Sequence, residues 1–242
     1  MRLFAQIAVA FIYCLSALGA AAQDRVVVIP LGGKKGSPAP VAKTGQSSCY
    51  DSDGDSISCA DSGQDGELQK GVAWPVPRFT DKGDGTVADN LTGLIWLMNA
   101  NCIGMEIPGF DRDLVNGDGK VTRQHALNFV AGLNSGTIRD DLGAPFPTNC
   151  GDASNGGTHQ SDWRLPNRFE LESLLDIGQV GPPLPSGHPF INVVLDYYWT
   201  SSYDSYYYDL GVGWAVHFSA GDVEAKSWKL EPCYAWPVRG GE

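Results

Sequence analysis

Oxygen-bearing side chains recur through residues 111–122, DRDLVNGDGKVT, at a spacing that suits a calcium-binding loop. With Asp118 at the fifth position of an EF-hand-type loop, an amide oxygen falls at the third position and Gly119 at the sixth. The first and twelfth positions lack a carboxylate, and an insertion would let two upstream aspartates supply the missing ligands. The predicted ligands are Asp111, Asp113, Asn116, Asp118, the backbone carbonyl of Lys120, and Thr122. The alternative is a polar loop in which Thr122 caps a helix.

Two other acidic stretches read as turns. The related segment DKGDGTVAD, residues 81–89, places Lys82 where a ligand would be needed, and a lysine repels a cation. Asp84-Gly85 lies between two strand-like runs and predicts a hairpin turn. The alternating carboxylates of DSDGD, residues 51–55, are interpreted as a hairpin tip.

The segment YDSYYYD, residues 203–209, concentrates aromatic rings and carboxylates. Tyrosine presents an apolar face and a hydrogen-bonding tip at a low cost in side-chain entropy, which suits recognition. Sugars stack on such rings while carboxylates accept their hydroxyl protons. The predicted ligand-binding residues are Tyr203, Asp204, Tyr206, Tyr207, Tyr208 and Asp209. Equally, these tyrosines could simply cover the sheet.

Catalytic patterns are weak. Ser201, Ser202 and the four histidines are scattered, and the Gly-x-Ser-x-Gly turn of a hydrolase nucleophile does not occur. Cys233 lies in an apolar strand-like run and is expected to be a buried strand residue rather than a nucleophile. The sequence therefore predicts a protein that is not an enzyme.

Residues 1–22 resemble a secretory signal peptide, with Arg2 at the start, an apolar run and a cleavage site of three alanines. Export, to the periplasm or the exterior, favours disulfides. Once Cys14 leaves with the leader, five cysteines remain, so at least one is unpaired within a monomer. Cys49 and Cys59 bracket a turn and are predicted to pair. Cys102 and Cys150 flank the first helical segment and form the second predicted pair, which leaves Cys233 free.

The chain is acidic, with 17 Lys and Arg against 28 Asp and Glu and a net charge of −11. Such a surface repels nucleic acid and sulfated polysaccharides. No segment after the leader is apolar enough to span a membrane. The expected partners are a glycan or a surface protein, and the oligomeric state is left open.

The patterning predicts an α+β fold in which two helices pack against an antiparallel sheet. Strand signals occupy residues 77–81, 86–89 and 93–98, and four more follow in the aromatic C-terminal third. A tight turn is predicted at 220–222, between the second and third of these four. One helix is predicted after Thr122. The second follows Asn167, whose capping box with Glu170 precedes a stripe of leucines. The predicted organisation is a signal peptide (1–22), an N-terminal strand and flexible linker (23–48), a disulfide-bridged hairpin (49–71) and one domain (72–242).

Four segments in this order resemble one bacterial family: PRFTDKGDGTVADNLTGLIWLMNANC, DWRLPNRFELESLLD, YYWTSS and YAWPVRG. The family is the C-terminal domain of bacterial collagen-like adhesins, the Lcl C-terminal-type domain, formerly a domain of unknown function. The resemblance covers roughly residues 72–241 and implies an exported binding domain with a C-type-lectin-like architecture. Its more distant relatives include formylglycine-generating enzymes, which use two nearby cysteines in their C-terminal region. This chain has only Cys233 there.

Two departures bear on the ligand. The best-studied adhesin of the family is trimeric and binds glycosaminoglycans, but this chain contains no Gly-x-y repeat and carries a net negative charge. The sequence therefore favours a secreted, non-enzymatic domain that recognises carbohydrate or a cell-surface partner without a basic cleft. The alternative is a structural domain of an envelope or extracellular assembly with no small ligand.

We predict that the 111–122 loop binds calcium with a Kd of roughly 10⁻⁴–10⁻³ M, the range of extracellular calcium modules. Millimolar calcium should raise the melting temperature of the protein, and Asp118→Asn should remove that rise. Asp84→Asn, in the related turn, is the matched control and should leave the calcium-dependent rise in place. A melting temperature that does not respond to calcium would show that the loop is a polar turn.

Overall fold

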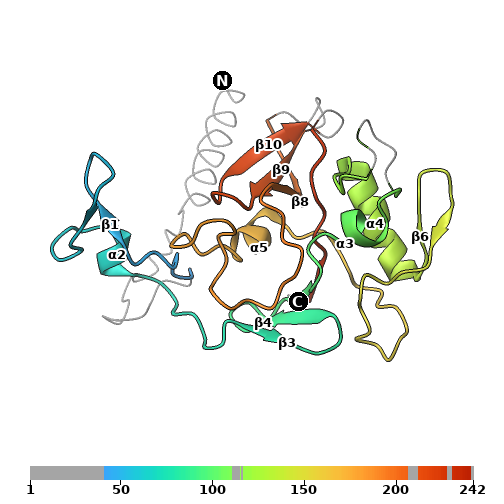
Figure 1. Ribbon diagram of the computed structural model, residues 1–242, viewed down its shortest axis with the longest axis horizontal. Helices are drawn as coiled ribbons and strands as arrows, with labels where there is room; N and C mark the ends of the chain where they lie inside the picture. The colour runs from blue at the N-terminus through green and yellow to red at the C-terminus, as the bar shows by residue number, and fades with distance from the viewer. Residues whose placement is uncertain (1–40, 111–114, 116, 207–211, 228–230, 241–242) are drawn as a thin grey trace, which may run out of the picture. The chain divides into compact units, whose positions relative to one another are not determined.

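The computed structural model describes residues 41–110, 115, 117–206, 212–227 and 231–240 (Figure 1). The predicted signal peptide and the strand-like residues 26–31 lie outside this part. In the described residues no helix combines the length and apolarity needed to cross a bilayer.

A four-stranded antiparallel sheet holds the first three predicted strands and the end of the chain, in the order β11-β5-β4-β3. Its strands are β3 (Phe79–Asp81), β4 (Thr86–Asp89), β5 (Ile95–Leu97) and β11 (Val238–Arg239). The turn predicted between β3 and β4 is confirmed, because Asp84 Oδ1 accepts the Thr86 N–H at 3.1 Å. Gly85 (φ +80°) follows, and a Cβ there would meet the Gly151 carbonyl at 1.7 Å, so this turn requires glycine.

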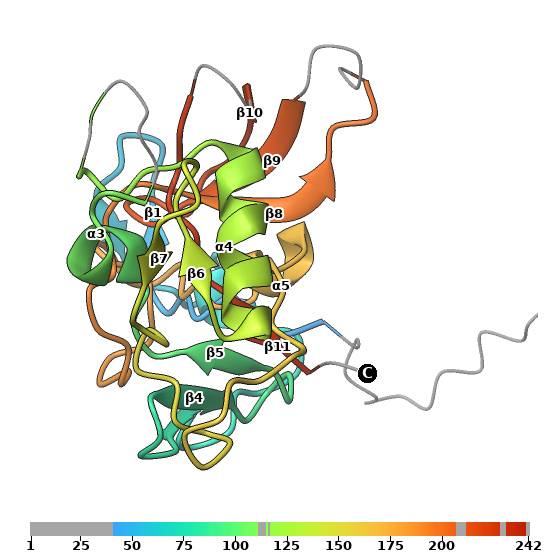
Figure 2. The same ribbon diagram turned by 90° about the vertical axis from the view of Figure 1, so that its right-hand side faces the viewer.

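A three-stranded antiparallel sheet in the order β10-β9-β8 forms the aromatic third of the chain. Its strands are β8 (Tyr197–Tyr203), β9 (Val212–His217) and β10 (Val223–Ser227). The predicted turn before β10 is confirmed by the His217 N–H, which donates to Asp222 O at 2.8 Å. The expected α+β class is correct, but the strands divide between two main sheets, with α5 between them in Figures 1 and 2.

The C-terminal residues 233–239 join the two sheets. Tyr234 pairs with Tyr198 of β8 in a parallel bridge, whereas Val238 pairs with Trp96 of β5 in antiparallel register. The segment is buried on both sides, because Tyr234, Ala235, Trp236 and Val238 are all at most 7% exposed. Its alternation predicted one continuous strand, whereas the structure has isolated bridges at Cys233 and Tyr234 and a two-residue strand, β11, at the edge of the four-stranded sheet.

Both predicted helices are present, and both begin at the predicted caps. In α4 (Arg123–Ser135) the Thr122 side chain accepts the His125 N–H, and in α5 (Arg168–Glu172) Asn167 and Glu170 form the capping box. The α5 helix is shorter than the leucine stripe suggests, although Leu171, Leu174 and Leu175 are all buried. Beyond Glu172 the chain continues in tighter turns, in which each leucine N–H donates three residues back.

Two short helices, α2 (Asp65–Leu68) and α3 (Cys102–Glu106), were not predicted. A two-stranded ribbon, β6 (Ile138–Arg139) with β7 (Pro145–Phe146), lies beside α4 (Figure 2). Gly132 of α4 approaches this ribbon closely, because a Cβ there would lie 2.8 Å from the Ile138 Cα.

The predicted disulfides are confirmed. Cys49 and Cys59 are bridged with Cα atoms 5.2 Å apart, and Cys102 and Cys150 with Cα atoms 5.6 Å apart. Cys233 is a free thiol and is buried. The first bridge closes the predicted hairpin of β1 (Cys49–Tyr50) and β2 (Ser56–Ile57).

The end of the predicted linker, residues 41–48, contacts the domain. The Lys43 N–H donates to Val72 O at 3.1 Å, the Val72 N–H donates to Val41 O at 2.8 Å, and the Ile177 N–H donates to Thr44 O at 2.8 Å. The Gly/Ser/Pro-rich composition indicated flexibility, but these backbone bonds depend on partners distant in sequence, which composition does not reveal.

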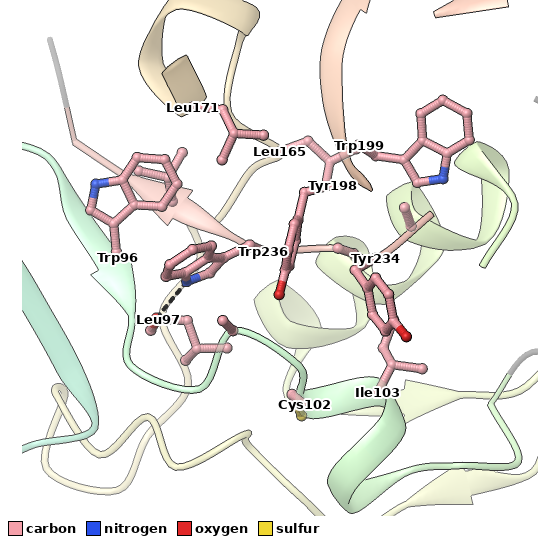
Figure 3. Close-up of a cluster of buried hydrophobic side chains, with 14 of the residues drawn as sticks. Trp96, Leu97, Cys102, Ile103, Leu165, Leu171, Tyr198, Trp199, Tyr234 and Trp236 are labelled. Carbon is pink, nitrogen blue, oxygen red and sulfur yellow. Dashed lines mark hydrogen bonds between the residues drawn. The ribbon is translucent and has the colours of Figure 1, made fainter. Parts of the chain in front are cut away.

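Aromatic side chains dominate the core around Trp236 (Figure 3). The Trp236 ring lies between those of Trp96 and Tyr198, with centroids at 5.7 and 5.6 Å. Its Nε1–H donates to Leu97 O at 2.8 Å, so the one polar atom of the indole is satisfied. The burial of Tyr198 raises the pKa of its phenol, whose oxygen accepts the Val194 N–H at 2.7 Å.

A buried ion pair joins the start of β3 to the end of β4. Arg78 Nε and Nη2 donate to the two carboxylate oxygens of Asp89 at 2.8 and 3.0 Å, and both residues are almost fully buried. Arg78 Nη2 also donates to Ser173 O at 2.8 Å, so the pair connects the four-stranded sheet to the turn after α5.

Asp89→Ala should lower the free energy of unfolding by about 3–5 kcal/mol, because it leaves the Arg78 guanidinium buried without its counter-ion. Urea denaturation followed by tryptophan fluorescence measures this change. Asp162→Ala breaks the more exposed ion pair with Arg239 and serves as the control, with an expected change of at most about 1 kcal/mol. Equal effects of the two substitutions would contradict the assigned role of the buried pair.

Candidate functional site

The predicted tyrosine segment begins at the end of β8. Tyr198, Trp199 and Thr200 are fully buried in that strand, whereas Tyr203 is 52% exposed and Tyr206 is 79% exposed. The first half of β8 is therefore buried in the core, and its last residue, Tyr203, lies at the surface. Tyr207, Tyr208 and Asp209 lie outside the described residues.

Arg123 supports the base of this surface. Its guanidinium carbon lies 4.6 Å from the centroid of the Tyr203 ring, and its Nη2 donates to Ser201 O at 2.7 Å. Burial lowers the pKa of Arg123, although a guanidinium remains charged at any physiological pH. As the first residue of α4, Arg123 couples that helix to the end of β8. Sequence reasoning missed this residue, because nothing local links it to a strand 78 positions away.

Asp204, one of the predicted ligand-binding residues, is buried rather than exposed to solvent. It is only 8% exposed, and its Oδ1 accepts the Tyr206 N–H at 2.8 Å. The Asp204 N–H in turn donates to Val212 O at 3.2 Å. The side chain closes a local turn, as aspartates commonly do, and so orients the backbone that carries Tyr206.

The predicted calcium loop is described only in part. Asp111, Asp113 and Asn116 lie outside the described residues, whereas Asp118, Lys120 and Thr122 lie within them. Among the described residues no three His, Cys, Asp or Glu side chains are grouped as a metal site. Calcium binding therefore stays a prediction.

The three described members of the loop make other contacts. Asp118 Oδ1 accepts the Lys120 N–H at 2.8 Å, and Thr122 caps α4. Lys120 Nζ lies 2.6 Å from Asp196 Oδ2; burial alone would raise the pKa of Asp196, but the hydrogen bond and charge of Lys120 outweigh it and lower that pKa. Gly119 (φ +82°) is needed for packing, because a Cβ there would lie 2.8 Å from the Gly104 Cα.

The candidate nucleophiles are engaged in structural contacts. Ser201 Oγ donates to Pro166 O at 3.2 Å, and Ser202 Oγ accepts the Arg168 N–H at 3.0 Å. Cys233 is 1% exposed, and burial raises the pKa of its thiol, which disfavours the reactive thiolate.

Taken together, the two disulfides and the mixed helix-and-sheet fold define a disulfide-stabilised α+β domain. The chain belongs to the Lcl C-terminal domain family, whose sequence profile matches residues 85–239. That match starts in the turn before β4 and ends at β11, so it includes the three-stranded sheet, the joining C-terminal segment and all strands of the four-stranded sheet except β3. No curated protein and no solved structure matches the chain, and the distant C-type-lectin-like relationship stays a prediction.

The Cys233 thiol should resist iodoacetamide in the native protein even at pH 9, because burial both blocks access and disfavours the thiolate. In guanidinium chloride the same thiol should be alkylated, while the four bridged cysteines stay unmodified until a reductant is added. Peptide mapping by mass spectrometry measures both states. Rapid alkylation of Cys233 in the native protein would contradict its burial.

Proposed function

We propose that this protein is a secreted, non-enzymatic binding module that recognises carbohydrate or a cell-surface partner through the surface that begins at Tyr203. The observation that supports this most directly is the exposure of Tyr203 and Tyr206 on a turn held by the buried Asp204. Large exposed rings on an ordered backbone are typical of recognition surfaces rather than of core packing.

The chemistry of this surface suits a neutral ligand. The face of a tyrosine ring packs against the C–H face of a sugar, and the phenol exchanges hydrogen bonds with hydroxyl groups. The contact with Arg123 holds the Tyr203 ring in place, which lowers the entropy lost when a ligand binds. The net charge of −11 argues against sulfated glycans, which require clustered lysines and arginines.

Two observations support a non-enzymatic role. The hydroxyl groups of Ser201 and Ser202 bond to backbone groups and so serve the packing of β8 against residues 166–168. The buried Cys233 is poorly suited to nucleophilic catalysis. Extracellular location agrees with the disulfides and with a family of adhesin-associated domains.

Tyr206→Ala should weaken binding to the highest-ranking glycan of a glycan array by about tenfold or more, the size of an aromatic hot spot. The melting temperature should not change, because the ring is largely exposed. Binding should also persist at high salt, since ring stacking and neutral hydrogen bonds are screened little.

Tyr50→Ala is the matched control, because Tyr50 is 45% exposed on the disulfide-bridged hairpin. Its glycan affinity should equal that of the unmodified protein. A glycan array without signal, with and without calcium, would instead favour a structural domain without a small ligand. Binding that disappears at moderate salt would show that the ligand is anionic.

A further inference from the structure

A groove of about 760 Å³ lies apart from the tyrosine surface and is lined mainly by apolar side chains. It is formed by the chain after residue 40, by the residues following β4, by α5 with its following turn, and by the start of β10. Its apolar lining includes Val41, Val72, Leu91, Phe169, Ile177 and Val223. Phe169 is 76% exposed, Val41 67% and Ile177 48%, so the groove presents large apolar side chains to solvent.

The walls of the groove are held by backbone bonds. Residues 41–43 pair with Val72, and the Ile177 N–H donates to Thr44 O. Phe169 is the second residue of α5, whose capping box fixes the first turn of that helix. The groove is therefore part of the folded domain, and its volume lies within the range of small-molecule sites.

The polar side chains that line the groove are satisfied, with one exception. Thr44 Oγ1 donates to Asp65, Thr92 Oγ1 donates to Asp89 at 2.8 Å, and Ser173 Oγ donates to Glu170 O at 2.7 Å. The Glu172 carboxylate forms an ion pair with Arg168 at 2.5 Å. Lys43 is half-buried, and its ammonium has no ion-pair or hydrogen-bond partner among the residues that the structure describes.

We propose that this groove binds a long-chain monocarboxylate, with the alkyl chain along its apolar walls and the carboxylate at the Lys43 ammonium. A lysine that lines an apolar groove, and whose charge is unpaired among the described residues, matches a ligand that has one negative charge and an apolar chain. A polypeptide fits less well, because its backbone N–H and C=O groups need partners and the polar groups of the groove are already engaged. This proposal is independent of the proposed function of the tyrosine surface.

The test is isothermal titration of the purified protein with dodecanoate, decanoate and dodecanol, each below its micelle concentration. Dodecanoate should bind about 15-fold more tightly than decanoate, from about 0.8 kcal/mol for each of the two buried methylenes. It should bind about tenfold more tightly than dodecanol, the size of a charge-assisted hydrogen bond.

Two variants separate the head group from the chain. Lys43→Gln should lower the affinity for dodecanoate to the affinity for dodecanol. Lys82 is exposed in the β3–β4 turn, and Lys82→Gln should leave both affinities unchanged. Phe169→Ala should weaken the binding of all three ligands. The Phe169 ring is largely exposed, so the fold should be retained, and a melting curve checks this directly.

Three outcomes would overturn the proposal. Failure of the unmodified protein to bind dodecanoate would exclude an alkyl ligand and leave a protein partner as the occupant of the groove. Equal affinities for dodecanoate and dodecanol would remove the role of Lys43. An unchanged affinity in Phe169→Ala would place the alkyl chain elsewhere. Tyr206→Ala should affect glycan binding and leave dodecanoate binding unchanged. The proposal for the groove and the proposal for the tyrosine surface are therefore tested independently.

Discussion

The pairing of residues 233–239 with both main sheets is the constraint on which the rest of the structure depends. The Tyr234 backbone is hydrogen-bonded to β8, and the Val238 backbone pairs with β5 and with Arg164. Trp236 lies between them, and its indole N–H donates to the Leu97 carbonyl. Neither main sheet has more than four strands, and small sheets need an apolar partner to be stable. The C-terminal segment supplies that partner to both sheets through the same aromatic core (Figure 3).

The proposed recognition surface at Tyr203 and Tyr206 depends on this core through β8. Trp199 is fully buried, and its Nε1–H donates to Val121 O at 2.8 Å, while Cys233 and Val121 exchange backbone bonds two residues before α4 begins. Arg123 then extends the same connection to the last residues of β8. The exposed tyrosines thus follow directly from a strand that is held by buried contacts. These contacts limit the conformational entropy that would be lost when a ligand binds.

The two candidate surfaces differ in chemistry. The tyrosine surface combines rings with hydrogen-bonding tips, which suits a polar and neutral ligand. The groove beside α5 is mainly apolar and includes Lys43, whose ammonium has no partner within the described part of the chain, which suits an amphiphile. Both can operate on a strongly acidic protein, because neither relies on a dense positive patch.

Local patterns in the sequence by themselves determined much of the fold. The caps at Thr122 and Asn167, the Asp84-Gly85 turn, the strand runs and the Cys49–Cys59 pair follow from short-range chemistry, in which a residue and its partner lie close in the chain. The Cys102–Cys150 pair, 48 residues apart, was predicted because the two cysteines flank the first helical segment. The family resemblance likewise rests on contiguous motifs, and the match over residues 85–239 confirms it.

Only the tertiary structure decided which strands share a sheet, which residues the end of the predicted linker contacts, and what the polar site residues contact. Asp204 reads in the sequence like an exposed ligand carboxylate, yet it is buried against its own turn. Arg123 and Lys43 carry no local signal, because their environments are made by residues 29 to 78 positions away. Sequence periodicity indicates which face of a helix or strand is buried, but not which residues pack against that face. Those contacts depend on residues distant in the sequence, which in this protein pack around Trp236.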